Sequence, residues 1–232
     1  MNRDTLLKVL NVLPQSVSAK ISRKYIQSKI KKYANLKVEG YENIQDLKGP
    51  ILFIANHLSN ADGLILNEVL EKHDPTFIAG VKLSDNDFTK KGISFVKTIS
   101  IKPNSADKDA VSKIVKKLKN GENIMIFPEG TRSRTGGMIE GKKGFLLMAK
   151  LSKAQIVPIG ISGTEKFLPI NDTDMGGEQF SPSNVTIKIG MPIALPEKEK
   201  DEDRNLYNER ALTETMKAIA ALLPEKYRGV YR

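Results

Sequence analysis

Residues 50–66 read PILFIANHLSNADGLIL, and the predicted fold is arranged around this stretch. Its first six residues form an almost unbroken apolar run, which predicts a short buried strand. From Ser59 onward the sequence is typical of a helix start, because Ser59 can cap the first turn and Asp62 follows three residues later. Asn56 and His57 lie between the strand and the helix. A strand that delivers polar residues to the start of a helix is a common way to build a site in an α/β fold.

The spacing of His57 and Asp62 suits a catalytic pair if His57 lies on the loop before the helix. On one continuous helix, five residues would turn about 500° and the two side chains would point apart. From a loop, the imidazole can fold back so that Asp62 accepts a hydrogen bond from one ring nitrogen and leaves the other basic. In the alternative interpretation, Asp62 only caps its helix and His57 is a satisfied loop histidine. This stretch alone leaves both interpretations open.

A second stretch has the same organisation. Residues 123–134 read NIMIFPEGTRSR, in which a predicted buried strand ends at Phe127 and is followed by charged residues. Gly130 would let the backbone approach a ligand closely, and the planar guanidinium of Arg132 suits phosphate oxygens. Taken alone, the stretch also fits a charged turn in which Glu129 pairs with an arginine.

Together, ANHLSNAD at 55–62 and FPEGTRSR at 127–134 resemble the glycerolipid acyltransferases of the lysophosphatidate acyltransferase family. The family's NHxxxxD box matches Asn56, His57 and Asp62, and its FPEGTRS box matches residues 127–133. VPIGI at 157–161 and GKKGF at 141–145 are similar to two further blocks of the family. The resemblance covers roughly residues 38–193, with the blocks in the family's order and spacing.

The resemblance implies an enzyme that moves a fatty acyl group from a thioester to the free hydroxyl of lysophosphatidic acid (1-acyl-glycerol 3-phosphate), giving phosphatidic acid. The acyl donor would be acyl-CoA or acyl-carrier protein, and no metal or redox cofactor is required. His57 would take the hydroxyl proton and Asp62 would orient the imidazole. Glu129 would orient Arg132 or bind an acceptor hydroxyl. The expected substrate-binding residues are Asn56, Glu129, Gly130, Thr131, Arg132 and Lys102.

The region between the two boxes departs from the family pattern. The family usually carries an arginine there, after a short strand, whereas residues 95–103 read FVKTISIKP. Lys102 is the nearest basic substitute, and Lys97 is the second candidate. Lysine offers a point charge in place of a bidentate fork, which weakens the assignment of the acceptor-phosphate contact.

Composition limits the remaining possibilities. A chain of 232 residues can hold one sizeable α/β domain, and the absence of cysteine excludes disulfides and cysteine metal sites. Two histidines leave little for a histidine-rich metal centre. The sequence has no apolar run of about 18 residues, so it predicts neither a transmembrane helix nor a secretory signal. The formal charge of +10 favours an anionic partner.

Much of this charge lies near the N-terminus, where residues 1–37 carry nine Lys or Arg against one acid, Asp4. Apolar residues are threaded through the segment, and Pro14 separates two predicted helices. We expect residues 1–36 to form a basic amphipathic segment on an anionic membrane, with the α/β acyltransferase domain at 37–232. The protein would then sit peripherally on the cytoplasmic face of the cell membrane. In the alternative, the helices pack on the domain and expose a basic face.

The remaining pattern alternates strands and helices, which predicts a single-domain layered α/β fold with a mostly parallel or mixed central sheet flanked by helices. Strand order is not readable. Predicted strands lie at 38–40, 76–81, 98–101, 156–161 and 185–189, predicted helices at 106–120, 142–150 and 204–223, and a loop at 171–184.

Other functions remain open at this stage. Glycerol 3-phosphate or another lysolipid could replace lysophosphatidate, and a thioester hydrolase could use the same His/Asp pair on water. A non-catalytic membrane-binding module would explain the charge but not the two boxes. Nucleic-acid binding is disfavoured, because the basic segment offers only Tyr25 and Tyr33 for base stacking.

Overall fold

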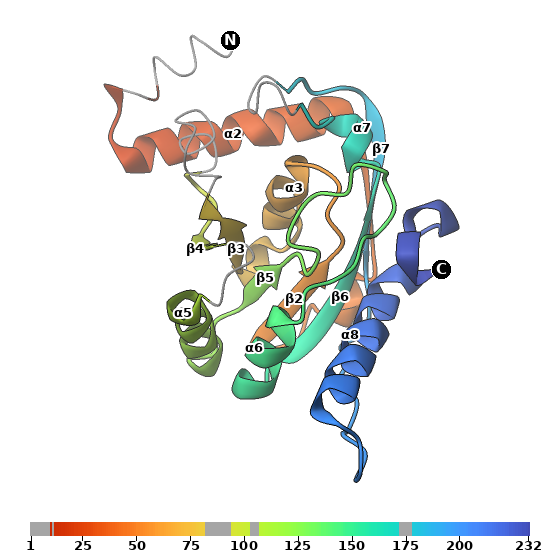
Figure 1. Ribbon diagram of the computed structural model, residues 1–232. Coiled ribbons are helices and arrows are strands. Elements are labelled where there is room, and N and C mark those ends of the chain that lie inside the picture. Colours follow the sequence, from red (N-terminus) through yellow and green to blue (C-terminus); the bar gives the residue numbers. More distant parts are fainter. Residues whose placement is uncertain (1–9, 11, 82–93, 103–106, 172–177) are drawn as a thin grey trace.

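The computed structural model describes residues 10, 12–81, 94–102, 107–171 and 178–232. Within these ranges, seven strands form one sheet in the order β1-β7-β6-β2-β5-β3-β4 (Figure 1). The strands are β1 (Ala34–Glu39), β2 (Ile51–Ala55), β3 (Thr76–Gly80), β4 (Thr98–Ile101), β5 (Ile124–Ile126), β6 (Gln155–Ser162) and β7 (Ser183–Ile189).

The predicted mixed sheet is confirmed. From β6 through β2, β5 and β3 to β4, all neighbouring strands are parallel. β7 runs antiparallel to β6, and β1 pairs in parallel with β7. The carboxyl ends of five strands therefore meet at one edge of the sheet, and β2, the second of these five, is the middle strand of the whole sheet.

Every residue of the central strand β2 is buried, so both faces of this strand need a covering layer. Phe53 faces a core shared with Ile26 of α2 (Gln15–Tyr33) and Ile65 of α3 (Ala61–Val69). Its neighbours Leu52 and Ile54 face a second core. The helices of that second layer are α5 (Lys108–Lys119), α6 (Gly144–Ser152) and α8 (Arg204–Ala221) (Figure 1).

The shorter elements are α7 (Thr164–Phe167) and the 3-10 helices η1 (Tyr41–Asn43), η2 (Glu71–His73), η4 (Glu225–Tyr227) and η5 (Gly229–Tyr231). Most predicted elements appear within about two residues of their expected ends. The first strand differs, since it begins at Ala34 and not at Val38. Residue 106 of one predicted helix and residues 172–177 of the predicted loop lie outside the described residues.

The described part of the N-terminal segment packs on the domain. Ile26 and Ile30 of α2 are buried in the first core, and Arg23 forms an ion pair with Glu68 of α3 at 3.0 Å. β1 follows α2 at once and joins the sheet from Ala34, so the expected boundary between residues 36 and 37 falls inside a strand. Residues 1–9 and 11 lie outside the described ranges.

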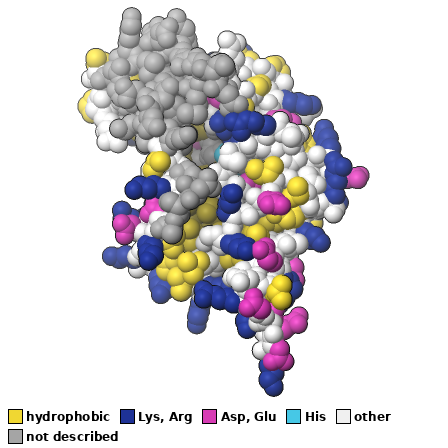
Figure 2. All heavy atoms as spheres, in the orientation of Figure 1, with side chains coloured by type: hydrophobic (Ala, Val, Ile, Leu, Met, Phe, Trp, Pro, Cys, Tyr) yellow, Lys and Arg dark blue, Asp and Glu magenta, His cyan; other side chains and the backbone are white. Residues whose placement is uncertain are grey.

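The outer side of α2 is basic, with Lys20, Lys24, Lys31 and Lys32 exposed. Elsewhere the charge is dispersed: on the coloured part of the surface in Figure 2, Lys and Arg side chains are scattered, with Asp and Glu among them. None of the helices in the described ranges combines the length and the apolar character needed to cross a bilayer.

Candidate active site

The site begins where β2 ends. Asn56 follows β2 directly, and its side chain is fully buried against β6. Its Nδ2 donates to the carbonyl oxygen of Ile161 at 2.9 Å, and the Ile161 N–H donates to Asn56 Oδ1 at 2.7 Å. This amide is therefore used to hold the loop on β6. Its contacts give Asn56 a positioning role, and its expected contact with substrate stays a prediction.

His57 lies on the loop before α3, as the catalytic interpretation requires. Its Nδ1 is 2.7 Å from Oδ2 of Asp62, whose side chain is fully buried. The same carboxylate oxygen accepts the backbone N–H groups of Leu58 at 2.6 Å and Ser59 at 2.9 Å. Asp62 thus caps the helix entry and orients the imidazole at the same time. The geometry required of a catalytic pair is therefore present, together with the capping contacts of the alternative interpretation.

The start of α3 is one residue later than a Ser59 cap would give, since the helix begins at Ala61 after Asn60. Ser59 nevertheless contributes to the helix entry: its Oγ accepts from the Ala61 N–H at 3.1 Å and donates to the carbonyl of Leu168 at 2.6 Å. The Ser59 hydroxyl therefore ties the loop both to the first turn of α3 and to Leu168, which follows α7.

The geometry sets the tautomer of His57. A carboxylate oxygen only accepts, so Nδ1 carries the proton and Nε2 keeps a lone pair for proton abstraction. The ring stacks on Phe127, with the ring centroids 4.1 Å apart and an angle of 12° between the planes. The imidazole side chain is 19% exposed, which leaves a path for a substrate hydroxyl. Phe127 was recognised only as part of a motif, and its stacking role was missed.

The loop after β5 holds the backbone of His57. Glu129 is fully buried, and its Oε1 accepts the His57 N–H at 2.8 Å while its Oε2 accepts the Ile139 N–H at 2.9 Å. From the same loop, the Ser133 N–H donates to the carbonyl oxygen of His57 at 2.8 Å. These contacts give Glu129 a role in positioning the base, and its expected contact with an acceptor hydroxyl or with Arg132 stays a prediction.

Burial raises the pKa of Glu129 to about 7. Desolvation is the largest cause, and the nearby Asp62 adds to it, whereas the N–H donors of Ile139 and His57 act in the opposite direction. The group that holds His57 in place therefore titrates close to neutral pH.

Arg132 lies on the same loop with an unfilled donor. Its Nη1 is 3.7 Å from Oε1 of Glu178, too far for a hydrogen bond, and this buried nitrogen has no hydrogen-bond partner among the described residues. Oε1 of Glu178 also accepts from Asn60 Nδ2 at 2.5 Å. Glu178 was missed by sequence reasoning, since nothing local to residues 127–134 points to it. A buried guanidinium nitrogen without an acceptor suits an anionic ligand.

Gly130 and Thr131 form the exposed tip between Glu129 and Arg132. Gly130 has φ +69°, a conformation that favours glycine.

The two candidate lysines lie at opposite edges of the sheet. Lys102 follows the carboxyl end of β4, on the edge that carries His57, and its N–H donates to Asp107 at 3.0 Å. Lys97 precedes β4 and pairs with Asp74 at the other edge, so it is excluded from the site. Lys102 is three strands from β2, which corresponds to about 14 Å across the sheet.

The second histidine, His73, is remote from this edge. Its carbonyl accepts from Asn123 Nδ2 at 2.7 Å, at the start of β5, and its ring lies edge-on to Phe53. Across the described ranges, no three His, Cys, Asp or Glu side chains are grouped so that they could hold a metal ion.

A buried carboxylate, an oriented imidazole and an arginine, gathered at the carboxyl edge of an α/β sheet, are the groups that a general-base site beside an anion-binding group would need. Residues 35–162 match the family model described as Acyltransferase. The chain belongs to this family.

Individual relatives are similar in sequence and in structure. A chloroplastic 1-acyl-sn-glycerol-3-phosphate acyltransferase of Arabidopsis thaliana is 27% identical over 75% of this chain and 48% of its own length. The 1-acyl-sn-glycerol-3-phosphate acyltransferase of Borreliella burgdorferi is 33% identical over 56% of this chain and 52% of its own length. The chain thus spans about half the length of these relatives.

The crystal structure of the 1-acyl-sn-glycerophosphate acyltransferase PlsC from Thermotoga maritima superposes with a TM-score of 0.63. The match has 23% sequence identity and covers 94% of this chain and 87% of that one. At this identity the likeness establishes the fold.

Proposed function

We propose that the chain transfers a fatty acyl group from a thioester donor to the free hydroxyl of 1-acyl-glycerol 3-phosphate, producing phosphatidic acid. The observation that carries this proposal is the 2.7 Å contact between His57 Nδ1 and Asp62 Oδ2 in a member of the acyltransferase family. The relatives suggest the acceptor, since they are 1-acyl-sn-glycerol-3-phosphate acyltransferases.

In the proposed reaction, His57 Nε2 removes the proton of the acceptor hydroxyl while the oxygen attacks the thioester carbon. The C–O bond forms, the carbonyl becomes a tetrahedral oxyanion, and Asp62 offsets the charge of the imidazolium. When the intermediate collapses, the C–S bond breaks and the imidazolium returns its proton to the leaving sulfur. The products are the ester and a free thiol, and His57 is restored.

Arg132 is the first candidate for the acceptor phosphate, because its buried Nη1 lacks a hydrogen-bond acceptor among the described residues. Lys102 is the second candidate, at the same edge of the sheet. Gly130 and Thr131 lie between Glu129 and Arg132 on the loop and are proposed to approach the same ligand.

The test is release of free thiol from a long-chain acyl-CoA by the purified chain, measured with and without lysophosphatidate. Acceptor-dependent release, with phosphatidate as product, is the expected outcome. Release that is equally fast without acceptor would assign the same His/Asp pair to thioester hydrolysis. A panel with glycerol 3-phosphate and other lysolipids identifies the acceptor, and acyl-carrier protein replaces CoA in a parallel assay.

We also propose that the chain acts peripherally at the cytoplasmic face of the cell membrane, through the basic segment at 1–36. Support comes from the four exposed lysines on α2 and from an acceptor that is itself a lipid. Each Lys near an anionic surface contributes about 1 kcal/mol, and raised salt weakens this term.

Because Ile26 and Ile30 belong to the core, deletion of α2 would disturb the fold, and charge substitution is the better experiment. Replacing Lys20, Lys24, Lys31 and Lys32 by Gln should reduce sedimentation with phosphatidylserine-containing vesicles. A control variant with four exposed lysines of α5 replaced by Gln (Lys108, Lys113, Lys116 and Lys119) has the same net charge. Equal loss in both variants would contradict a specific role of the N-terminal segment.

A further inference from the structure

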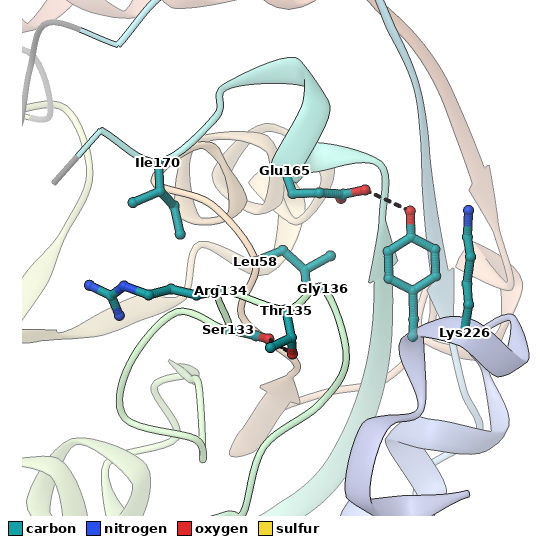
Figure 3. A pocket seen from close by; sticks show the side chains of 9 residues that line it. Leu58, Ser133, Arg134, Thr135, Gly136, Glu165, Ile170 and Lys226 are labelled. Atoms are coloured by element: carbon teal, nitrogen blue, oxygen red, sulfur yellow. Dashed lines mark hydrogen bonds between the residues drawn. The ribbon is translucent and has the colours of Figure 1, made fainter.

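A pocket of about 580 Å³ opens beside the catalytic loop. Its walls come from four segments: the loop after β2, the loop after β5, the region of α7, and η4 (Figure 3). The lining residues include Leu58, Thr135, Glu165, Ile170, Lys226 and Tyr227. This volume falls within the range of small-molecule sites, roughly 300–1,000 Å³.

Two walls of the pocket are built on the segments that hold the base. Leu58 follows His57, and its N–H donates to Asp62 Oδ2 at 2.6 Å. Ser133 also lines the pocket, and its N–H donates to the carbonyl of His57 at 2.8 Å. A ligand in this pocket would therefore lie next to the reaction centre.

The far wall carries a carboxylate that is only half used. Glu165 Oε1 accepts from the hydroxyl of Tyr227 at 2.8 Å, a contact drawn in Figure 3. Its Oε2 is buried and has no hydrogen-bond partner in the described part of the chain. Burial and the contact with Glu165 raise the pKa of Tyr227 to about 12, so the phenol remains a donor to Oε1. Oε2 therefore keeps unused acceptor capacity, which a ligand N–H or O–H could satisfy once the side chain turns toward the pocket.

The pocket also combines apolar and cationic groups. Leu58 and Ile170 provide apolar surface, and Lys226 is exposed beside the Tyr227 ring, with its Nζ 5.0 Å from the ring centroid. Arg134 extends on the opposite side of the pocket in Figure 3. This mixture fits an extended ligand with amide or hydroxyl donors along its length and phosphate at its outer end.

Position in the sheet sets the Glu165 wall of this pocket apart from Lys102, whereas the wall formed by Ser133 and Arg134 directly follows Arg132. Glu165 lies in α7, directly after β6, and β6 is the neighbour of β2 on one side. Lys102 follows β4, on the other side of β2. A base that activates a hydroxyl against a thioester carbon must lie between the two substrates, so they approach it from different directions.

We propose that this pocket binds the amide-containing arm of the donor's thiol carrier, of the phosphopantetheine class, with Glu165 Oε2 accepting from the arm and Lys226 contacting its phosphate. The inference rests on the proposed function, because it locates the acyl donor, one of the two substrates of that reaction, in this pocket. It makes Glu165 and Lys226 donor-binding residues, which neither of the two sequence boxes contains.

The experiment compares two donors with the same acyl chain, one esterified to CoA and one to ethanethiol, which lacks the arm. In Glu165→Gln, the preference for acyl-CoA, measured as the ratio of kcat/KM values, should fall about tenfold, because a neutral amide replaces a charged acceptor. Lys226→Ala should lower the same ratio about threefold through loss of one phosphate contact. The KM for lysophosphatidate should stay within about twofold of the wild-type value.

Lys166→Ala is the matched control, since Lys166 is exposed on α7 next to Glu165 and does not line the pocket. Calorimetric binding of free CoA to the wild type and to Glu165→Gln checks the site without turnover. If Glu165→Gln keeps normal activity and an unchanged ratio of kcat/KM values for the two donors, the pocket assignment is overturned. The proposed function would not be affected by that result. A changed lysophosphatidate KM with an unchanged donor ratio would give the pocket to the acceptor. A wild-type chain without acceptor-dependent thiol release would instead overturn the proposed function.

Discussion

Two loops meet at His57, and they hold it in different ways. The loop after β2 works through contacts within five residues, since Asp62 accepts from His57, Leu58 and Ser59. The loop after β5 works over a separation of 72 residues, since Glu129 reaches the His57 N–H. The first loop determines which ring nitrogen is basic, and the second determines where the ring lies. Two different carboxylates thus serve these two roles: Asp62 sets which ring nitrogen is basic, and Glu129 helps to place the ring.

This division has an energetic consequence. In the proposed reaction Asp62 acts on the imidazole that takes the proton, so its loss should appear mainly in kcat. Glu129 acts on the backbone, so its loss should appear in both the free energy of unfolding and the rate. Substitutions in the two loops can therefore be ranked, from the reacting group outward.

The largest effect is expected for His57→Ala. Removal of the base should lower kcat about 10⁴-fold, because general-base catalysis supplies up to that factor. The fold should persist, since the ring is partly exposed and the polar contacts of the second loop are with the His57 backbone. Circular dichroism and thermal unfolding provide the control. A folded variant with near-normal turnover would contradict the mechanism.

Asp62→Asn tests the local loop. An amide that turns its oxygen toward Leu58 and Ser59 no longer favours the basic Nε2 tautomer, and we expect kcat to fall roughly 10³-fold. The KM values should change little, because Asp62 is fully buried and makes its contacts inside the loop. A loss confined to KM would show that Asp62 serves binding and not the imidazole.

The sequence narrowed the local loop to two interpretations for a physical reason. His57 and Asp62 are five residues apart, and a strand end followed by a helix start leaves few ways to arrange them. The central strand was equally readable, because an apolar run such as residues 51–55 has to be covered on both faces.

The contacts of the second loop were not predictable in the same way. Glu129 reaches His57, and Arg132 lies near Glu178, only because distant strands and loops meet at one edge of the sheet. Strand order decides such meetings, and no pattern within residues 123–134 encodes it. For the same reason, the sequence could not show that α2 contributes Ile26 and Ile30 to the core.

Glu129→Gln tests the distant loop. The amide nitrogen would face one of the two backbone N–H donors, so we expect kcat to fall about tenfold and the protein to be less stable. Glu122→Gln, an exposed substitution at the end of α5, is the matched control. An unchanged rate and stability would remove Glu129 from the positioning of His57.

Stability measured against pH sharpens this test. The raised pKa of Glu129 means that the folded chain binds a proton between about pH 4.5 and pH 7 that the unfolded chain has released. The contribution of Glu129 to the free energy of unfolding should therefore fall as pH rises through this window and level off above it. The difference between the wild type and Glu129→Gln isolates this term. A difference that grows with pH would contradict the assignment.

The smallest effect is expected for Arg132→Lys, which keeps the charge and removes the planar fork. Arg132 belongs to the second loop, but none of the hydrogen bonds among the described residues joins its side chain to His57, so kcat at saturating substrate should change little. The KM for lysophosphatidate should rise about tenfold, because a point charge replaces a group that can bind phosphate through two donors. The KM for the acyl thioester should stay within about twofold. Arg210→Lys is the matched control, since Arg210 also pairs with a glutamate, Glu202, but lies on α8. If only the KM for the thioester changes, Arg132 binds the donor. The donor would then approach His57 from the side of Lys102, and the acceptor from the side of Glu165.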